Sequence, residues 1–210
     1  LATRLKLTNA DEWCPTAATD GRNFYYNTRF IEMLKPKEIE FLFGHEVLHC
    51  VYDHFGRKGD RDPMLWNVAN DYAVNADLKK HRVGEFITSV PCLFDYKYED
   101  WSSEEIYDDL YENAEKIDME QLIDQVLDQH LDGSEGEGDS SGEDGEGKGP
   151  ARLSDEDRQQ IKDEIKEAML QAAQASDAGN IPGGVKRLIQ QLTEPKLNWR
   201  ELLAMQLEST

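Results

Sequence analysis

The amino-acid sequence predicts a predominantly helical α+β protein with a small sheet or hairpin near its N-terminus. From residue 36 onwards, apolar residues recur three and four positions apart over long stretches, which is typical of amphipathic helices. Before that point, two short extended segments flank an Asp-Gly pair, and this pattern is typical of strands and a tight turn. The order of these signals places the sheet first and the helices after it.

The predicted strands are residues 4–7, which alternate weakly between charged and apolar side chains, and the aromatic segment 23–27. Asp20 and Gly21 lie between them and supply the turn. If the aromatic segment lies at the edge of the sheet, it can pair with an extended peptide. Packing of its rings over the next helix is at least as good an interpretation. The candidate substrate-binding residues are Phe24, Tyr25 and Tyr26.

Two helices with clear boundaries follow. The first is expected from Pro36, which suits a first helical position, to about Gly56. The second is expected to begin with Asp62 as its N-cap and Pro63 in its first turn, and it cannot extend beyond Gly84. The loop between them is short, so we expect the two helices to be antiparallel.

The remaining helical signals are distributed over the rest of the chain. Ser102 and Glu105 form the S-x-x-E pattern of a capping box, which marks the start of a third helix. Other helices are predicted at residues 119–127, residues 154–176, around Leu188 and after Asn198.

An acidic segment divides the chain. Residues 132–149 read DGSEGEGDSSGEDGEGKG and contain no apolar residue. Gly, Ser and like charges cannot offset the entropy cost of ordering a backbone, so we expect a disordered tether here. The predicted organisation is a core at residues 1–131, the tether at residues 132–149, and a helical extension at residues 150–210 that packs on the core.

Composition limits the partners and the compartment. The 210 residues include 43 acidic and 23 basic side chains, which gives a net charge of −20. This charge opposes binding to nucleic acids and to anionic membranes, and no apolar run approaches the roughly 20 residues that span a bilayer. Three cysteines without a short spacing favour a reducing compartment, so we expect a cytoplasmic protein. Because Leu1 is no initiator, we expect the numbering to begin inside a longer chain.

The segment His45-Glu46-Val47-Leu48-His49 carries the strongest chemical signal. Positions four apart lie on one face of a helix, so both imidazoles can bind one metal ion. Glu46 lies about 100° round the helix from His45, close enough to hold a water molecule bound to that metal. Neutral imidazoles suit zinc, and a catalytic zinc has three protein ligands and one open position. A third protein ligand is therefore needed.

Asp71 on the second predicted helix is the first candidate for that ligand. The antiparallel arrangement of the two helices would place its carboxylate opposite the histidine pair. Asn75, one turn later, could accept a hydrogen bond from the outer nitrogen of a ligand imidazole. His54, which follows His49 by five residues, is the second candidate.

The residues His45, Glu46, His49 and Asp71 resemble the gluzincin branch of zinc metallopeptidases, typified by thermolysin. In that branch an HExxH helix is followed by a helix that supplies an acidic third ligand, and a carboxylate four residues later contacts a ligand. This chain has Asp71 where those enzymes have Glu, and Asn75 where they have Asp. A shorter carboxylate needs closer helices, and three small residues would allow this: Ala69, Ala73 and Ala76.

His54 instead suggests the metzincin arrangement, in which a third histidine follows the HExxH motif. Those enzymes place it six residues after the second histidine, behind a glycine that turns the chain. Here the interval is five, and Tyr52 stands where the glycine would be. If the helix continued, His54 would lie about 140° away from His49. Three roles stay open for His54: third ligand, a group that contacts a ligand or stabilises an oxyanion, or a cation at a helix end.

A broader resemblance covers nearly the whole chain. The strings TDGRNFYYN at 19–27, HEVLHCVYDH at 45–54 and WNVANDYAVN at 66–75 resemble the metallopeptidase-like domain that precedes a VWA-like domain in many bacterial and phage proteins. IPGG at 181–184 and WRELL at 199–203 also fit that family. The resemblance implies a zincin-like core, one bound Zn²⁺ and a VWA-like domain that would follow this chain.

These signals together predict a zinc-dependent metallopeptidase that acts on peptide or protein substrates. Zinc held by His45, His49 and Asp71 would activate a water molecule and polarise the scissile carbonyl. Glu46 would take the proton of that water and pass it to the leaving amine. The alternative is a catalytically silent adaptor in which the metal is a structural staple and the chain acts with a VWA-like domain and an AAA+ ATPase. A nucleic-acid hydrolase is disfavoured by the net charge of −20.

Overall fold

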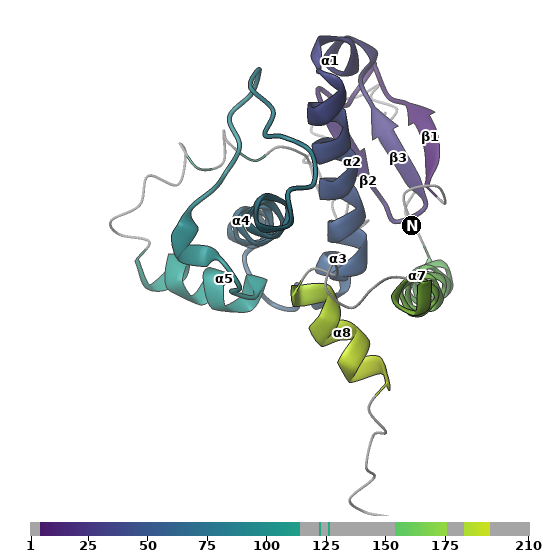
Figure 1. Ribbon diagram of the computed structural model, residues 1–210, viewed down its shortest axis with the longest axis vertical. Coiled ribbons are helices and arrows are strands. Elements are labelled where there is room, and N and C mark those ends of the chain that lie inside the picture. The colour runs from purple at the N-terminus through teal and green to yellow at the C-terminus, as the bar shows by residue number, and fades with distance from the viewer. Residues whose placement is uncertain (1–4, 114–121, 123–125, 127–153, 176–182, 194–210) are drawn as a thin grey trace, which may run out of the picture.

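A computed structural model of the chain describes residues 5–113, 122, 126, 154–175 and 183–193. Within these residues helices predominate and one three-stranded sheet lies near the N-terminus, which confirms the predicted α+β fold class. Figure 1 shows the sheet beside one long helix, with two further helices on the other side of it. These three helices are α2 (Pro36–Val51), α4 (Pro63–His81) and α5 (Ser103–Glu112).

Some predicted elements lie outside the described residues. They are the acidic tether at residues 132–149, most of the predicted helix at residues 119–127, and the predicted helix after Asn198.

Three short strands form the sheet: β1 (Lys6–Asn9), β2 (Ala17–Thr19) and β3 (Asn23–Tyr26). Their order is β1-β3-β2, with β1 parallel and β2 antiparallel to β3. The Asp-Gly turn therefore joins β2 to β3, and Asp20 stabilises it. The Oδ1 atom of Asp20 accepts hydrogen bonds from the backbone N–H groups of Arg22 and Asn23, at 2.8 and 2.7 Å. The sequence did not predict β2, whose three residues are too few to show an alternating pattern.

β3 lies in the middle of the sheet, with β1 on one side and β2 on the other. Both of its hydrogen-bonding edges are occupied, so the prediction of an aromatic edge strand is wrong. The ring of Phe24 stacks on Phe43 of α2 with 4.3 Å between centroids, and the hydroxyl of Tyr25 donates a hydrogen bond to Asp20 Oδ2 at 2.8 Å. Peptide binding by Phe24, Tyr25 and Tyr26 was predicted on the assumption that they lie in an edge strand, and this assumption is not met.

Two short helices flank α2: α1 (Thr28–Met33) and α3 (His54–Arg57). The first predicted helix was expected to reach Gly56, but α2 ends at Val51. The break lies at Asp53, which adopts the left-handed conformation with a φ of 51°. Asp is one of the few residues besides Gly that tolerate this conformation. The chain turns there, and His54 contacts the last turn of α2.

α4 and α5 begin where the capping patterns predict. Asp62 is the N-cap of α4, and its Oδ1 accepts a hydrogen bond from the N–H of Leu65 at 2.8 Å. Ser102 and Glu105 form the capping box of α5, in which Glu105 Oε2 accepts from the N–H of Ser102 at 2.7 Å. α4 packs on α2 with one face and on α5 with another.

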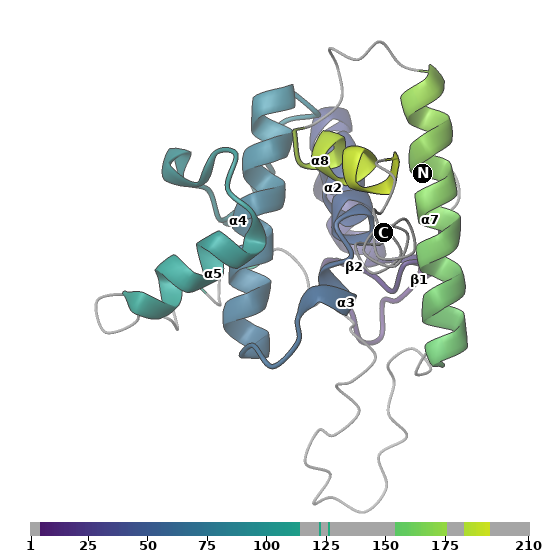
Figure 2. The same ribbon diagram turned by 90° about the horizontal axis from the view of Figure 1, so that it is seen from below.

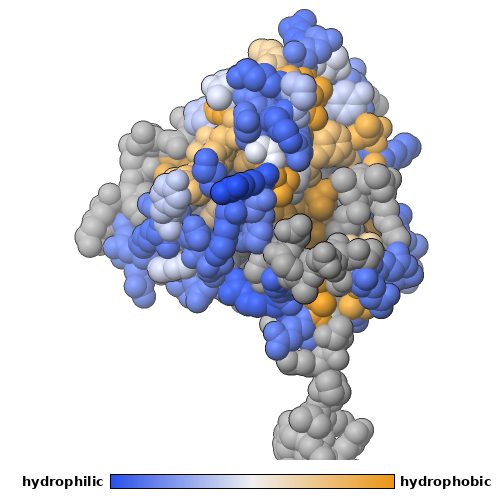
Figure 3. Space-filling model, in the orientation of Figure 1, coloured by the Kyte–Doolittle hydropathy of each residue, from blue (hydrophilic) through white to orange (hydrophobic). Residues whose placement is uncertain are grey.

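The two helices of the C-terminal extension pack on the rest of the protein: α7 (Asp155–Ala175) and α8 (Gly183–Thr193). Figure 2 shows α7 along the outside of the sheet and α2. Lys162 of α7 forms an ion pair of 2.9 Å with Asp53, and apolar residues of both helices join the core between α2 and the sheet. On the face shown in Figure 3, hydrophilic surface covers α5, whereas apolar surface gathers around α2 and the sheet.

The segment after α4 folds back along α2. Gly84 has a φ of 64°, and a Cβ added there would lie 2.4 Å from Phe41 N and 2.5 Å from the carbonyl oxygen of Lys37. The N–H of Glu85 donates a hydrogen bond to the same carbonyl at 3.0 Å. The segment then continues to Leu93, whose carbonyl accepts a hydrogen bond from Asn75 of α4.

Replacing Gly84 with Ala should lower the free energy of unfolding by about 2 kcal/mol or more, because positive-φ strain is combined with a clash against backbone. Gly59→Ala is the matched control. Gly59 has a φ of 59°, but its added Cβ would meet only Arg61 Nη1, at 3.9 Å. The control should therefore cost only about 1 kcal/mol. Urea unfolding of both variants measures the difference, and equal losses would contradict the role of the close approach.

Glu38 attaches the same segment to the start of α2. Its Oε2 accepts a hydrogen bond from the N–H of Lys35 at 2.8 Å, and its Oε1 accepts from the N–H and the hydroxyl of Thr88 at 2.9 and 2.7 Å. These bonds favour the ionised carboxylate, so they lower the pKa of Glu38 from 4.5 to about 2.

The stabilisation from Glu38 should depend on pH. A carboxyl group whose pKa is lower in the folded protein stabilises the fold fully above its unfolded pKa, and this contribution is lost as the pH falls. For Glu38 it should be complete above about pH 4.5 and disappear by about pH 2. Urea unfolding of the wild type and Glu38→Gln across this range provides the test. The difference in unfolding free energy between them should shrink as the pH falls, and a constant difference would contradict the prediction.

Candidate metal centre

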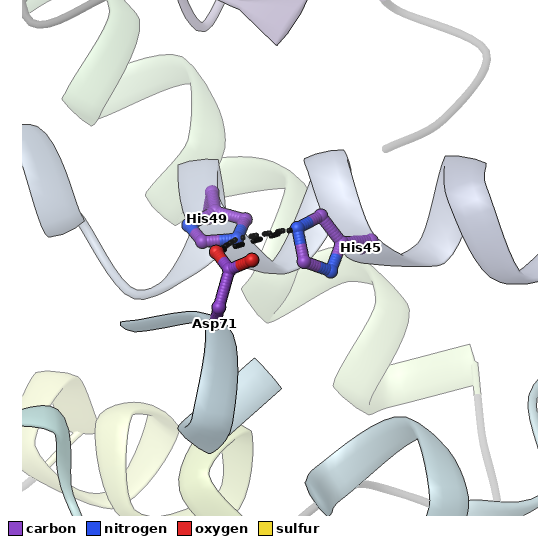
Figure 4. A group of neighbouring side chains, drawn as sticks. All are labelled: His45, His49 and Asp71. Carbon is purple, nitrogen blue, oxygen red and sulfur yellow. Dashed lines mark hydrogen bonds and ion pairs between the residues drawn. The ribbon is translucent and has the colours of Figure 1, made fainter. Parts of the chain in front are cut away.

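Two helices bring three potential metal ligands together. α2 carries His45 and His49 one turn apart, and Asp71 of α4 faces both of them (Figure 4). The Nε2 atoms of the two histidines are 3.0 Å apart, and Asp71 Oδ1 lies 3.7 Å from Nε2 of His45 and 3.6 Å from Nε2 of His49. All three side chains are fully buried, so the group lies between the helices.

Gly44 lies where α2 packs closely on α4. A Cβ added at Gly44 would lie 2.8 Å from Leu78 Cδ2 of α4, so a larger residue would require the Leu78 side chain to shift. Two of the three alanines that were expected to allow this approach, Ala69 and Ala73, belong to the apolar core shared with α5. The missing side chain at Gly44 therefore leaves room for Leu78 where the two helices meet.

Asn75 fixes the orientation of His45. Its Nδ2 donates a hydrogen bond to the carbonyl of Leu93 at 2.8 Å, so its Oδ1 faces His45 Nδ1, which lies 2.9 Å away. An amide oxygen only accepts hydrogen bonds, so the proton of His45 is on Nδ1. The lone pair of His45 Nε2 then faces His49 and Asp71, which is the orientation that a metal ligand requires.

His54 also lies at the site, but on the outer side of His49. The Nδ1 atoms of these two residues are 2.9 Å apart, whereas the ligand group forms at Nε2 of His49. His54 is 2% exposed, and its Nε2 lies 3.0 Å from Ser103 Oγ. Its carbonyl accepts a hydrogen bond from Trp66 Nε1 at 2.9 Å. The left-handed Asp53 provides the turn that no glycine marks in the sequence.

Two further buried polar residues adjoin the ligands along the chain. Glu46 follows His45 on α2 and is fully buried, and Asn70 precedes Asp71 on α4 and is 1% exposed. Asn70 Oδ1 has no hydrogen-bond partner within the described part of the chain. The sequence did not single out Asn70 or Ser103. Ser103 is 49 residues away from its partner histidine and follows a serine that already caps α5, so no local pattern marks it.

A pocket of about 600 Å³ lies next to His54, bordered by the end of α2, by α3 and α4, by the start of α5, and by α8. Its polar wall includes His54, Ser103, Tyr52, Asp77 and Arg187. The hydroxyl of Tyr52 donates a hydrogen bond to Asp77, and burial raises the pKa of Asp77 above its usual range. His45, His49 and Asp71 do not border the pocket, whereas His54 borders it and contacts His49.

The three donor atoms fit a metal ion. Each lies within 4.8 Å of the other two. Ligand atoms about 2.0–2.2 Å from a tetrahedral metal are about 3.3–3.6 Å from one another. The observed separations of 3.0, 3.6 and 3.7 Å are close to this size. Two imidazole nitrogens and a carboxylate oxygen also form a donor set that divalent transition metals prefer.

The helical α+β fold and the buried His-His-Asp group define a protein with a candidate metal site between two helices. The family model described as "Putative metallopeptidase domain" matches residues 1–210, and the chain belongs to this family. The predicted resemblance to a metallopeptidase-like domain is thereby confirmed. A search of curated proteins and a search of solved structures found no match. In the described part of the chain, every helix is too short or too polar to cross a membrane.

Proposed function

We propose that this protein is a zinc-dependent peptidase in which His45, His49 and Asp71 hold the metal and Glu46 acts as the general base. One observation carries the proposal: two imidazole nitrogens and a carboxylate oxygen converge inside the fold of a chain that belongs to a metallopeptidase family. This donor set suits zinc and leaves one position for the reacting group.

The position of each residue supports a role in hydrolysis. Zinc would supply Lewis acidity, which lowers the pKa of water and polarises a carbonyl group. Asn75 holds His45 in the tautomer that presents Nε2, and His54 contacts Nδ1 of His49. Glu46, fully buried directly after His45, would take a proton on its carboxylate and pass it to the leaving amine. The burial of the group strengthens these electrostatic interactions.

A second function is favoured by the complete burial of the ligands. A catalytic zinc has an open position that the substrate must reach, whereas structural zinc sites are closed. His45, His49 and Asp71 are all fully buried, which resembles a closed site. In this alternative the metal has a structural role and holds α2 and α4 together. The protein is then an adaptor with a VWA-like domain and an AAA+ ATPase as partners.

Organisation and compartment are part of the same proposal. We divide the chain into a core at residues 1–131, a tether at residues 132–149 and an extension at residues 150–210, whose helices α7 and α8 pack on the core. None of the three cysteines, all of them among the described residues, forms a disulfide, which supports a reducing compartment and therefore the cytoplasm. The net charge of −20 disfavours nucleic-acid and anionic-membrane partners.

The two functions differ in whether the zinc-loaded protein cleaves peptides. Metal analysis after incubation with zinc should give one ion per chain, and a fluorogenic peptide library should be cleaved by the loaded protein but not after chelation. Zinc binding without cleavage, including by a longer chain that contains a VWA-like domain, would favour the adaptor. A protein that binds no zinc would refute both functions.

A further inference from the structure

Ser103, His54 and His49 form a continuous chain of polar contacts that ends at the candidate metal position. Ser103 Oγ lies 3.0 Å from His54 Nε2, and His54 Nδ1 lies 2.9 Å from His49 Nδ1. The chain continues from His49 Nε2 to His45 Nε2 at 3.0 Å, and from His45 Nδ1 to Asn75 Oδ1 at 2.9 Å. All five side chains are buried, so bulk water competes little for these contacts.

The hydrogen bond between Asn75 and His45 determines which atom is the donor in every other hydrogen bond of this series. A neutral imidazole has one donor and one acceptor nitrogen, so the proton position on one ring sets the position on the next. Asn75 places the proton of His45 on Nδ1, which leaves His45 Nε2 as an acceptor. Without metal, His49 therefore donates from Nε2 to His45 and accepts at Nδ1 from His54. His54 Nε2 then accepts a hydrogen bond from the hydroxyl of Ser103.

We propose that metal binding exchanges donor and acceptor in the hydrogen bonds that link His49, His54 and Ser103, an inference that rests on the proposed zinc site. A metal held by Nε2 of both His45 and His49 requires the His49 proton on Nδ1, where it donates to His54 Nδ1. The proton of His54 must then be on Nε2, where it donates to Ser103 Oγ. The number of protons does not change, because His49 and His54 each exchange a proton on one nitrogen for a proton on the other.

Ser103 suits the end of the chain because a hydroxyl group can both donate and accept. It satisfies the buried Nε2 of His54 in both directions, whereas an alanine would leave that nitrogen without this partner. Ser103 is thus a positioning residue, which acts on the ligand His49 through His54. Because Ser103 and His54 also border the 600 Å³ pocket, the start of α5 connects the pocket wall to the metal ligand.

The proton positions on the histidine rings can be read by NMR. Long-range ¹H–¹⁵N spectra should show the proton of His54 on Nδ1 in metal-free protein and on Nε2 after one equivalent of zinc. The proton of His45 should stay on Nδ1 in both states. His54→Gln assigns the His54 signals, and His81, in the last turn of α4, is the internal reference. If His54 has its proton on the same nitrogen with and without zinc, the reversal is refuted.

Adjacent serines give a matched pair of variants for zinc affinity. Ser103→Ala should weaken zinc binding by about 3- to 10-fold, less than the roughly 10- to 100-fold loss for a direct partner of a ligand. Ser103→Thr keeps the hydroxyl and should restore the affinity. Ser102→Ala removes the capping hydroxyl of the same helix, so it should lower thermal stability and leave zinc affinity unchanged. Equal zinc affinities of Ser103→Ala and Ser102→Ala would overturn this inference alone, whereas a wild type without zinc affinity would overturn the proposed function.

Discussion

Glu46→Gln is expected to abolish peptide cleavage in a protein that still binds one zinc ion. The Glu46 carboxylate is not among the three donor atoms that meet at the candidate site, and Gln preserves the volume of this fully buried side chain. Gln cannot take a proton from the attacking water, so the proposed mechanism loses its general base. The cleavage rate should fall by about 100-fold or more, which is the usual scale for such a group.

The measurements for Glu46→Gln are kcat/KM on a fluorogenic peptide and the zinc content per chain, with thermal unfolding as a check of the fold. Glu40→Gln is the matched control on the same helix, because Glu40 is a half-exposed carboxylate paired with Lys37 at 2.5 Å. This control should keep both cleavage and zinc. Retained cleavage in Glu46→Gln would contradict its role as the base, and loss of zinc would assign Glu46 to the metal site instead.

The starts of the helices could be predicted from the sequence because their signals are local. Asp62 and Ser102 each cap a helix through a backbone N–H three residues later, so a few neighbouring residues contain the whole interaction. The end of α2 carries no such local signal. Asp53 takes a left-handed conformation and forms an ion pair with Lys162, which lies on α7 far along the chain. No pattern near Asp53 indicates that partner.

The same distinction applies to the candidate site. The pairs His45/His49 and Asp71/Asn75 are each four residues apart, so helical periodicity alone places each pair on one face. The contacts that connect these pairs to the rest of the fold are not periodic. Asn75 is held by a carbonyl of the segment after α4, and the Leu78 side chain of α4 packs against a glycine of α2. Such contacts come from tertiary packing, which sequence spacing does not record.

Asp71→Asn is expected to weaken zinc binding far more than any substitution of His54. The Oδ1 atom of Asp71 lies 3.7 and 3.6 Å from the Nε2 atoms of His45 and His49, where the donor atoms converge. His54 instead contacts Nδ1 of His49, the nitrogen that points away from the group. Asn keeps the shape of the side chain but removes the negative charge that compensates a dication. The loss should exceed the roughly 10- to 100-fold that is typical of an outer partner.

Zinc titration with a competing chelator compares Asp71→Asn with His54→Ala, which should lose no more than about 10- to 100-fold in affinity. Asp77→Asn is the matched control, because Asp77 is a carboxylate on the same helix that accepts its hydrogen bond from Tyr52 outside the ligand group. Its zinc affinity should equal that of the wild type. If His54→Ala loses zinc while Asp71→Asn retains it, the third ligand is His54 and the metzincin-like arrangement is correct. The chain would then have to rotate the His54 ring away from Ser103, since both of its nitrogens are engaged in the present geometry.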